Sequence, residues 1–305
     1  MTPTMTTAER RGYQQICGAN GFMMVVAADQ RGGMRKVLAD TPEAEAAIDE
    51  ATLGVVKADI VRHLANKATC VLLDAVCAVP AVVDDGVLSR DTALLVGLDA
   101  SGWDTDAGGY RISRLVPGIT ARRTRELGGT GAKLMVYLRP DRPEANTVNM
   151  QIIRDCVADF AAEDLLLVVE ILTYRLDDED KSAYADAFPD LIVECARMAL
   201  EAGSKVLKLP YPGTADACRR ITELSAGVPW AVLSAGVDHE TFIGQVETAM
   251  ANGASGVIAG RSLWKDCISL DAETCASRLE NIASKRLREI ETVLDAHAVR
   301  PSRAA

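Results

Sequence analysis

The sequence predicts an α/β protein whose parallel strands close into a (β/α)8 barrel, and three observations support this fold. Eight short apolar runs, rich in β-branched residues, recur between residues 22 and 259. Longer stretches with a helical pattern of apolar residues separate most of them, which is typical of repeated βα units around a parallel sheet. Polar and charged residues gather where the runs end, which is the edge at which such barrels bind their ligands.

The expected strands follow one another along the whole chain. They cover residues 22–28, 69–73, 93–98, 132–138, 165–171, 205–209, 230–234 and 256–259. Helices are expected at 43–66, 120–127, 149–162, 183–202, 215–226, 239–252 and 271–296. Between the second and third runs, Pro80 and Asp84-Asp85-Gly86 indicate a loop with at most a short helix. An open doubly wound sheet is the alternative, but no G-x-G-x-x-G follows the first run.

The length suits one barrel domain rather than two domains. The chain has 305 residues, of which 49% are hydrophobic, and single α/β barrels often exceed 250 residues. We expect residues 1–298 to form one barrel domain with an N-terminal helical extension. Residues 299–305, VRPSRAA, are expected to be a flexible tail.

Charge and cysteine usage exclude several classes of protein. A net charge of −10 argues against a nucleic-acid partner or an anionic membrane surface, because both need basic patches. The start of the chain has no signal-peptide pattern, and its apolar runs are too short to span a bilayer. The eight cysteines form no C-x-x-C pair. We therefore expect a cytoplasmic protein without disulfides.

Polar residues at the run ends are the candidate site. A charged side chain that points into a barrel costs free energy unless it is paired or functional. Because side chains alternate along a strand, Lys208 is the inward-facing lysine of KVLK, whereas Lys205 is expected to be solvated. We also expect Glu170 to face inward. On the fourth run, the inward face is expected to carry Lys133, Met135 and Tyr137. The other polar residues at run ends are Asp29, Gln30, Arg31, Asp74, Asp99, Ser234, Gly236, Gly260 and Arg261.

Seven segments carry a family resemblance over nearly the whole chain. They are AADQRGGMRKVL (27–38), VLLD (71–74), GAKLMVYLRPD (131–141), VVEILTY (168–174), VLKLPYP (206–212), VLSAGVDHETF (232–242) and GASGVIAGRSLW (253–264). In this order they resemble the class I tagatose 1,6-bisphosphate aldolases of the LacD type, and more distantly the sulfofructose-phosphate aldolases.

The resemblance implies a role for each matching residue. Lys208 corresponds to the Schiff-base lysine, Glu170 to the carboxylate that moves protons, and Lys133 to a second active-site lysine. Asp29 and Gln30 are implied to contact the substrate. Ser234, Gly236 and Arg261 are implied to bind phosphate, with Gly260 allowing close backbone approach. Arg31 and Arg139 are candidates for a second anion site. The alternative for each charged residue is a structural ion pair, such as one between Glu170 and Lys133.

These residue types suit cleavage of a ketose next to its carbonyl. A protonated imine at C2 accepts the electrons of the breaking C3–C4 bond, and a lysine forms it only as a neutral amine. An ordinary lysine has a pKa of about 10.4, which burial or a neighbouring cation can lower toward about 7–8. We expect Lys133 to be that cation. The histidines argue against zinc chemistry, because His63, His239 and His297 are not placed at strand ends and form no metal-binding motif.

The sequence thus predicts a class I aldolase that needs no cofactor or metal. Its substrate is expected to be a ketose 1,6-bisphosphate such as tagatose 1,6-bisphosphate, cleaved to glycerone phosphate and glyceraldehyde 3-phosphate. One alternative is a 6-deoxy-6-sulfofructose-1-phosphate aldolase, which would release sulfolactaldehyde. A non-catalytic sugar-phosphate sensor and a phosphate-binding isomerase are alternatives of other classes. By analogy with the family, we expect the protein to form a homo-oligomer. The molecule that it binds is expected to be a small sugar phosphate.

Overall fold

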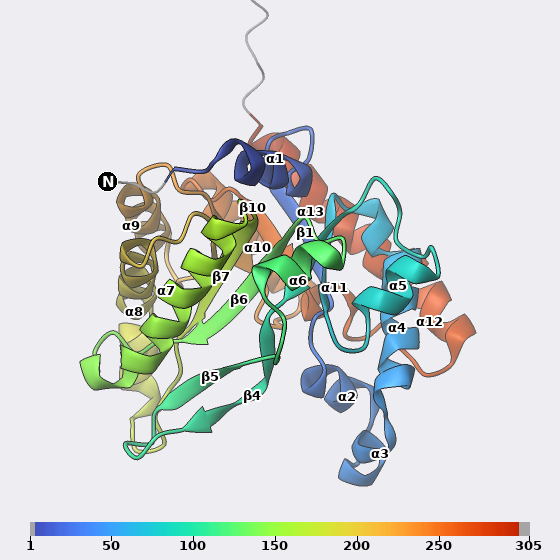
Figure 1. Ribbon diagram of the computed structural model, residues 1–305, viewed down its shortest axis with the longest axis horizontal. Coiled ribbons are helices and arrows are strands. Elements are labelled where there is room, and N and C mark those ends of the chain that lie inside the picture. The colour runs from blue at the N-terminus through green and yellow to red at the C-terminus, as the bar shows by residue number, and fades with distance from the viewer. Residues whose placement is uncertain (1–3, 299–305) are drawn as a thin grey trace, which may run out of the picture.

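Eight parallel strands close into a barrel in the computed structural model, which describes residues 4–298 (Figure 1). Neighbouring strands follow the order β1–β10–β9–β8–β7–β6–β3–β2 and back to β1. The strands are β1 (Met23–Ala27), β2 (Cys70–Asp74), β3 (Ala93–Gly97), β6 (Gly131–Tyr137), β7 (Leu166–Leu172), β8 (Leu207–Pro210), β9 (Trp230–Leu233) and β10 (Gly256–Ala259). The predicted (β/α)8 barrel and its eight strands are confirmed. The predicted tail, residues 299–305, lies outside the described residues.

Alternation along the strands separates two buried layers. One set of side chains fills the barrel and includes Val25, Leu72, Leu95, Val168 and Ile258. The side chains between them point outward and pack against the surrounding helices. The interior is therefore a packed core up to the level at which the polar residues begin.

The helices that cover the barrel begin largely where the sequence predicts. They are α4 (Glu50–His63), α5 (Val79–Asp84), α6 (Ala121–Glu126), α7 (Thr147–Ala162), α8 (Lys181–Glu201), α9 (Ala215–Ser225), α10 (His239–Ala251), α11 (Arg261–Trp264), α12 (Ala272–Arg278) and α13 (Ser284–Ala296). A π-helical turn, Leu279–Ala283, joins α12 to α13. Among residues 4–298, no helix is long and apolar enough to cross a membrane.

One predicted helix is broken in two. The stretch expected as a single helix over 43–66 forms α3 (Pro42–Ala47) and α4, followed by a short 3-10 turn. Thr41 accepts a hydrogen bond from the backbone of Ala44, and Asp49 accepts one from Thr52. Each side chain caps a helix N-terminus, so the chain has two helix starts where the sequence predicted one.

The N-terminal helix closes one end of the barrel. Helix α1 (Thr7–Ile16) is capped by Thr6 and Glu9, and Ile16 packs among the interior residues. Glu9 also binds the Nζ of Lys205 at 2.6 Å. The expectation that Lys205 is a solvated residue was therefore wrong: it lies half-buried against α1.

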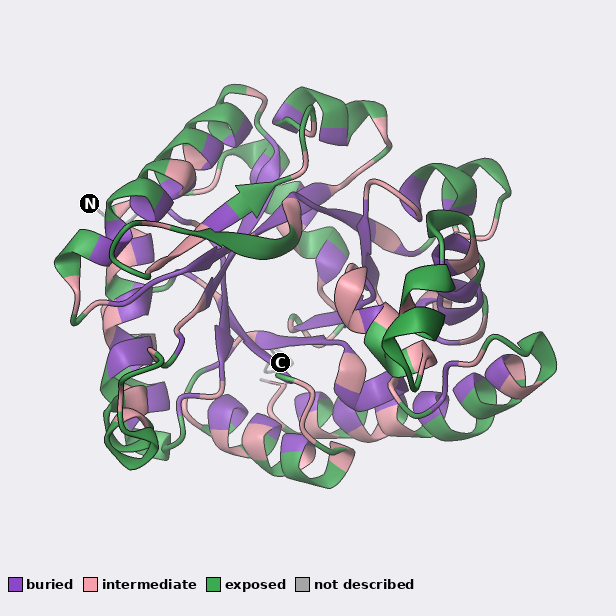
Figure 2. Ribbon diagram, turned by 90° about the horizontal axis from the view of Figure 1, so that it is seen from below, coloured by how far each residue is buried: buried purple, intermediate pink, exposed green. Residues whose placement is uncertain are grey.

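The opposite end of the barrel carries a hairpin that the sequence did not predict. Strands β4 (Asp99–Thr105) and β5 (Arg111–Leu115) pair antiparallel between β3 and β6 in the chain. Figure 2 looks onto this end and shows the hairpin as an exposed ribbon over the barrel strands. Helix α2 (Gly32–Leu38) and α3 lie after β1 at the same end. The carboxyl ends of the barrel strands therefore open beneath added structure.

Candidate active site

Lys208 and Glu170 face each other inside the barrel. Lys208 lies on β8 and Glu170 on β7, and the two residues are register partners. Their side chains point inward as the alternation predicts, and Lys208 is only 4% exposed. The Nζ of Lys208 lies 2.8 Å from Oε2 of Glu170. An amine and a carboxylate thus share a proton-transfer contact in a site largely closed to water.

Lys133 is surrounded by three carboxylates. It lies on β6 and is 2% exposed. Its Nζ is 2.7 Å from Oδ2 of Asp29 and 3.4 Å from Oε2 of Glu170, and it also binds Oδ1 of Asp99. These acids come from strand ends far apart in the sequence. Glu170, and not Lys133, contacts the amine of Lys208. The carboxylate of Glu170 therefore links the two lysines.

Burial and charge oppose each other in this cluster. Burial would raise the pKa of Asp29, but the charges of Lys133, Lys208 and Lys57 lower that pKa to about 2. Burial would lower the pKa of Lys133, but Asp29, Asp99 and Glu170 raise it well above its usual value. Burial raises the pKa of Asp99, and the neighbouring carboxylates add to that effect against the attraction of Lys133. The three carboxylates therefore favour the charged form of Lys133.

A cavity of about 230 Å³ joins the Lys208–Glu170 pair to the predicted phosphate-binding residues. Besides that pair it is lined by Ala27, Gln30, Leu172, Leu233, Ser234, Ala235, Gly236, Ile258, Gly260 and Arg261. The structure thus gathers Gln30, Ser234, Gly236, Gly260 and Arg261 around Lys208. Asp29 and Lys133 are connected to the same cavity through Glu170.

The loop after β9 is shaped for close approach of a ligand. Ala235 and Gly236 both have positive φ angles, of 49° and 82°. A Cβ on Gly236 would lie 3.3 Å from the guanidinium of Arg261. A Cβ on Gly260 would lie 2.8 Å from the carbonyl oxygen of Ala27. These two residues form a turn closed by a hydrogen bond from the Val237 N–H to the Ser234 carbonyl oxygen, and turns are among the backbone conformations that bind anions.

Several polar atoms of the site have no partner among residues 4–298. The buried Oδ1 of Asp29 and Oε1 of Gln30 accept no hydrogen bond there. Within the same described part of the chain, no carboxylate lies within 4.0 Å of Arg261. Unpaired buried acceptors are costly. These atoms are available to the hydroxyl groups and the anion of a bound substrate.

The two candidates for the second anion site do not line the Lys208 cavity. Arg139, a candidate for the second anion site, is fully buried, and its guanidinium binds the carboxylates of Asp141 and Glu179. These bonds contradict the expected anion site at Arg139, because its donors are already occupied. Arg31 remains at the barrel mouth, where it is half-buried and donates to the backbone oxygen of Asp99 at 3.4 Å.

Lys57 belongs to the charged cluster, although the sequence analysis did not single it out. It is fully buried on α4 and binds Oδ2 of Asp74. Oδ1 of Asp74 accepts hydrogen bonds from the backbone of Val76 and Cys77. The signal was present in the helix, because Lys57 falls among Leu53, Val56 and Ile60 on the buried face. Asp74 is thus held in a structural ion pair.

The histidines lie on or next to helices and not at strand ends, as predicted. His63 ends α4, His239 begins α10, and His297 follows α13. Within residues 4–298, no group of three or more His, Cys, Asp or Glu side chains is arranged to hold a metal ion. The point where three carboxylates converge is filled by the ammonium group of Lys133.

Two relatives with similar sequences are both named as tagatose 1,6-diphosphate aldolases. A tagatose 1,6-diphosphate aldolase 2 of Streptococcus agalactiae is 25% identical, and the alignment covers 95% of this chain and 96% of that protein. The tagatose 1,6-diphosphate aldolase of Lactococcus lactis is 26% identical, with 85% and 86% covered.

Solved structures share the fold at lower identity. A Schiff-base-forming fructose-1,6-bisphosphate aldolase superposes with a TM-score of 0.64 at 18% identity, covering 93% of this chain and 98% of that one. A fructose-bisphosphate aldolase of Slackia heliotrinireducens gives 0.66 at 15% identity, with 100% and 96% covered.

The family model described as DeoC/LacD family aldolase matches residues 23–266, from the first barrel strand to the segment after the last. This match includes every residue of the Lys208 cavity. It favours an enzyme over the sugar-phosphate sensor that the sequence left open. The chain therefore belongs to the DeoC/LacD family of aldolases, and it is an aldehyde-lyase.

Proposed function

We propose that the protein is a class I aldolase that cleaves a ketose 1,6-bisphosphate through an imine on Lys208. The observation that carries this proposal is the 2.8 Å contact between the Lys208 amine and Glu170. That contact lies in a cavity that also holds Ser234, Gly236 and Arg261. A nucleophilic amine, a proton acceptor and an anion site thus meet in one enclosed space.

Imine formation needs Lys208 to lose a proton and the substrate carbonyl to lose an oxygen. Glu170 accepts the ammonium proton of Lys208, and the neutral amine then attacks C2 of the ketose. The resulting carbinolamine loses its hydroxyl as water when Glu170 returns a proton. Lys133 stays charged throughout and stabilises Glu170 as a carboxylate before the first of these transfers and after the second.

Bond cleavage then proceeds with the imine as the electron acceptor. Glu170 removes the proton of the C4 hydroxyl, and the C4 oxygen becomes the carbonyl of the released aldehyde. The electron pair of the C3–C4 bond moves into the C2–C3 bond and neutralises the iminium nitrogen. The free acceptor atoms of Asp29 and Gln30 suit hydrogen bonds from substrate hydroxyls. Protonation at C3 and hydrolysis release glycerone phosphate and restore Lys208.

The phosphate on C1 is assigned to the loops after β9 and β10. The half-buried Arg261 offers bidentate N–H donors, and Gly236 and Gly260 leave room for the oxyanion to reach backbone N–H groups. These loops often hold phosphate in barrels of this kind. The relatives named as tagatose 1,6-diphosphate aldolases favour tagatose 1,6-bisphosphate as the substrate. The second product is then glyceraldehyde 3-phosphate.

Borohydride trapping tests this function. The protein is incubated with glycerone phosphate, reduced and digested, and the modified peptide is identified by mass spectrometry. We expect the reduced adduct on Lys208 and none in Lys208→Met. An adduct on Lys133 or Lys205 would move the imine to another strand position. Phosphate binding without any adduct would refute the class I mechanism and favour an isomerase.

A further inference from the structure

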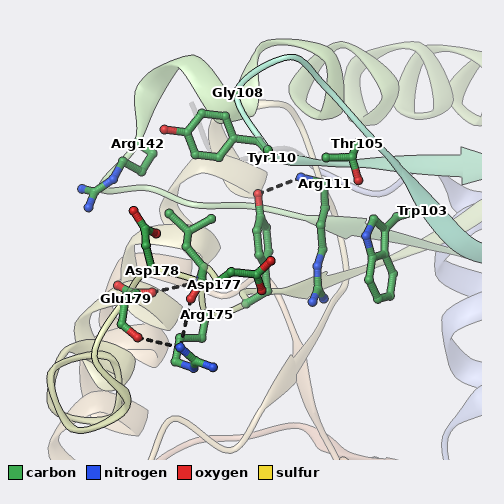
Figure 3. A pocket seen from close by; sticks show the side chains of 13 residues that line it. Trp103, Thr105, Gly108, Tyr110, Arg111, Arg142, Arg175, Asp177, Asp178 and Glu179 are labelled. Atoms are coloured by element: carbon green, nitrogen blue, oxygen red, sulfur yellow. Dashed lines mark hydrogen bonds between the residues drawn. The ribbon is translucent and has the colours of Figure 1, made fainter.

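A second cavity, of about 590 Å³, lies between the β4–β5 hairpin and the loop after β7. Arg111, at the start of β5, extends its side chain beside Trp103 in this cavity (Figure 3). The guanidinium lies 3.8 Å from the ring centre of Trp103 and 4.6 Å from that of Tyr174. A third ring, Tyr137, lies 5.1 Å away. Aromatic rings thus fix the position of one arginine head group.

Arg111 differs from the other arginines that line this cavity. Arg142 binds Asp141, and Arg175 donates to the backbone oxygens of Leu176 and Glu179. The guanidinium of Arg111 has no ion pair with any residue in the range 4–298, and its side-chain hydrogen bond is to the neutral hydroxyl of Tyr137. Stacking occupies the faces of a guanidinium but leaves its in-plane N–H donors free. Arg111 is therefore an oriented cation that lacks an anion.

The acidic side chains of the cavity leave this cation available. Figure 3 shows Asp178 and Glu179 on the opposite side of the cavity from Arg111 and Trp103, with Asp177 between them. Both oxygens of Glu179 are bound by Arg139. Arg111 instead lies against Tyr137, the last residue of β6, whose register partner on β7 is Leu172. Leu172 lines the Lys208 cavity, so the neighbouring residues Tyr137 and Leu172 link the Arg111 site to that cavity.

The strand order places the Arg111 site across the barrel from Arg261. In the closed sheet, β6 and β10 are four strands apart in either direction, and β8 lies midway between them. Tyr137 ends β6, Arg261 follows β10, and Lys208 lies on β8. A linear substrate joined to Lys208 near its middle, with an anion at each end, matches this arrangement. Met135 and Lys208 both pair with Glu170, and successive inward side chains of a strand lie roughly 7 Å apart, so Tyr137 lies about one layer beyond the level of Lys208.

We propose that Arg111 binds the second anionic group of the substrate, the tetrahedral oxyanion carried by the aldehyde half. This inference rests on the proposed function and gives the anion site a residue other than Arg139. A phosphate and a sulfonate share the required chemistry, because both present oxygen acceptors to a guanidinium fork. Trp103, Tyr137 and Tyr174 hold the fork in place, so Arg111 determines which aldehydes are accepted.

The test measures condensation of glycerone phosphate with three aldehydes: glyceraldehyde 3-phosphate, sulfolactaldehyde and uncharged glyceraldehyde. For the wild type we expect kcat/KM to favour a charged aldehyde at least about tenfold, the scale of a charge-assisted contact. In Arg111→Met this preference should fall at least about tenfold, mainly through KM. Arg111→Lys should keep part of it, since the charge remains without the fork. The anionic aldehyde whose rate falls more identifies the phosphate or the sulfonate.

Arg142→Met is the matched control, because Arg142 lines the same cavity but already has a carboxylate partner. It should keep the wild-type preference. Two results would overturn the inference: an unchanged preference in Arg111→Met, including an equal loss with charged and uncharged aldehydes, or a wild type without any preference. Failure of the proposed function would give a different result from failure of this inference. The wild-type protein would then form no borohydride-reduced adduct with glycerone phosphate.

Discussion

Glu170 and Lys208 are register partners on neighbouring strands, and their side-chain contact of 2.8 Å lies inside the barrel. The same Oε2 atom of Glu170 is 3.4 Å from Lys133. Glu170 is thus held between two lysines, of which only Lys208 loses its proton in the proposed mechanism. This arrangement ties the reactivity of Lys208 to a carboxylate whose charge depends on a third residue.

Glu170→Gln should separate binding from proton transfer. The amide keeps the size of the side chain and a hydrogen bond to Lys208, but it cannot take up a proton. We expect the cleavage rate to fall by about 10²–10⁴-fold, the usual contribution of a positioned acid or base. Single-turnover cleavage is the measurement, with Glu201→Gln on the exposed end of α8 as the control. A loss of less than about fivefold would assign the proton transfers to another group.

Lys133→Met should destabilise the fold as well as the reaction. The change leaves Asp29, Asp99 and Glu170 close together in a buried site without their common cation. Removing one partner of such a group typically costs about 3–5 kcal/mol. Urea unfolding measures the loss, and Lys181→Met, exposed on α8, serves as the control.

A second substitution tests the cause of that loss. Adding Asp99→Asn to Lys133→Met removes one of the stranded charges, so the double variant should be more stable than Lys133→Met alone. Additive losses would show that the carboxylates do not depend on Lys133, since coupled residues deviate from additivity.

The barrel and much of this site were predictable because both follow from local patterns. Apolar runs located the eight strands, and alternation placed Lys133, Glu170 and Lys208 on the inner face. The β4–β5 hairpin was not predictable in the same way, because most of its residues are half-buried or exposed and carry no apolar alternation. Its signals were the turn Asp106–Gly109 and the isolated Trp103.

Side-chain partners across the fold were also beyond sequence patterns. Arg139 was a fair candidate for an anion site until Asp141 and Glu179 were found to occupy it. Glu179 lies 40 positions away along the chain. Lys57 likewise meets Asp74 only because α4 packs beside β2. Such contacts depend on tertiary packing, which composition and periodicity do not encode.

Protonation of Asp29 at low pH should lower the free energy of unfolding by a defined amount. Its folded pKa of about 2 lies below the ordinary value of 3.8. The lowered pKa stabilises the fold above about pH 4, and this contribution disappears as the pH falls through the folded value. The difference corresponds to roughly 2 kcal/mol. Urea midpoints between pH 5 and 2.5 should therefore drop less steeply in Asp29→Asn than in Asp40→Asn, an exposed control. Parallel slopes would contradict the assigned ion pair.

Replacing either of two glycines with positive φ angles should have different effects on the binding of glycerone phosphate. Gly236 and Gly227 both have positive φ, of 82° and 93°. Alanine at either position should therefore cost about 1–2 kcal/mol of stability. A Cβ on Gly227 meets nothing within 4 Å, whereas one on Gly236 lies 3.3 Å from the guanidinium of Arg261.

Only Gly236→Ala should therefore disturb the proposed phosphate site. We expect its apparent Kd for glycerone phosphate, measured by the concentration dependence of borohydride trapping, to rise about tenfold, or ~1.4 kcal/mol. Gly227→Ala should bind as the wild type does despite a similar loss of stability. Equal weakening in both variants would mean that binding follows general stability. Normal binding in Gly236→Ala would move the C1 phosphate away from the loop after β9.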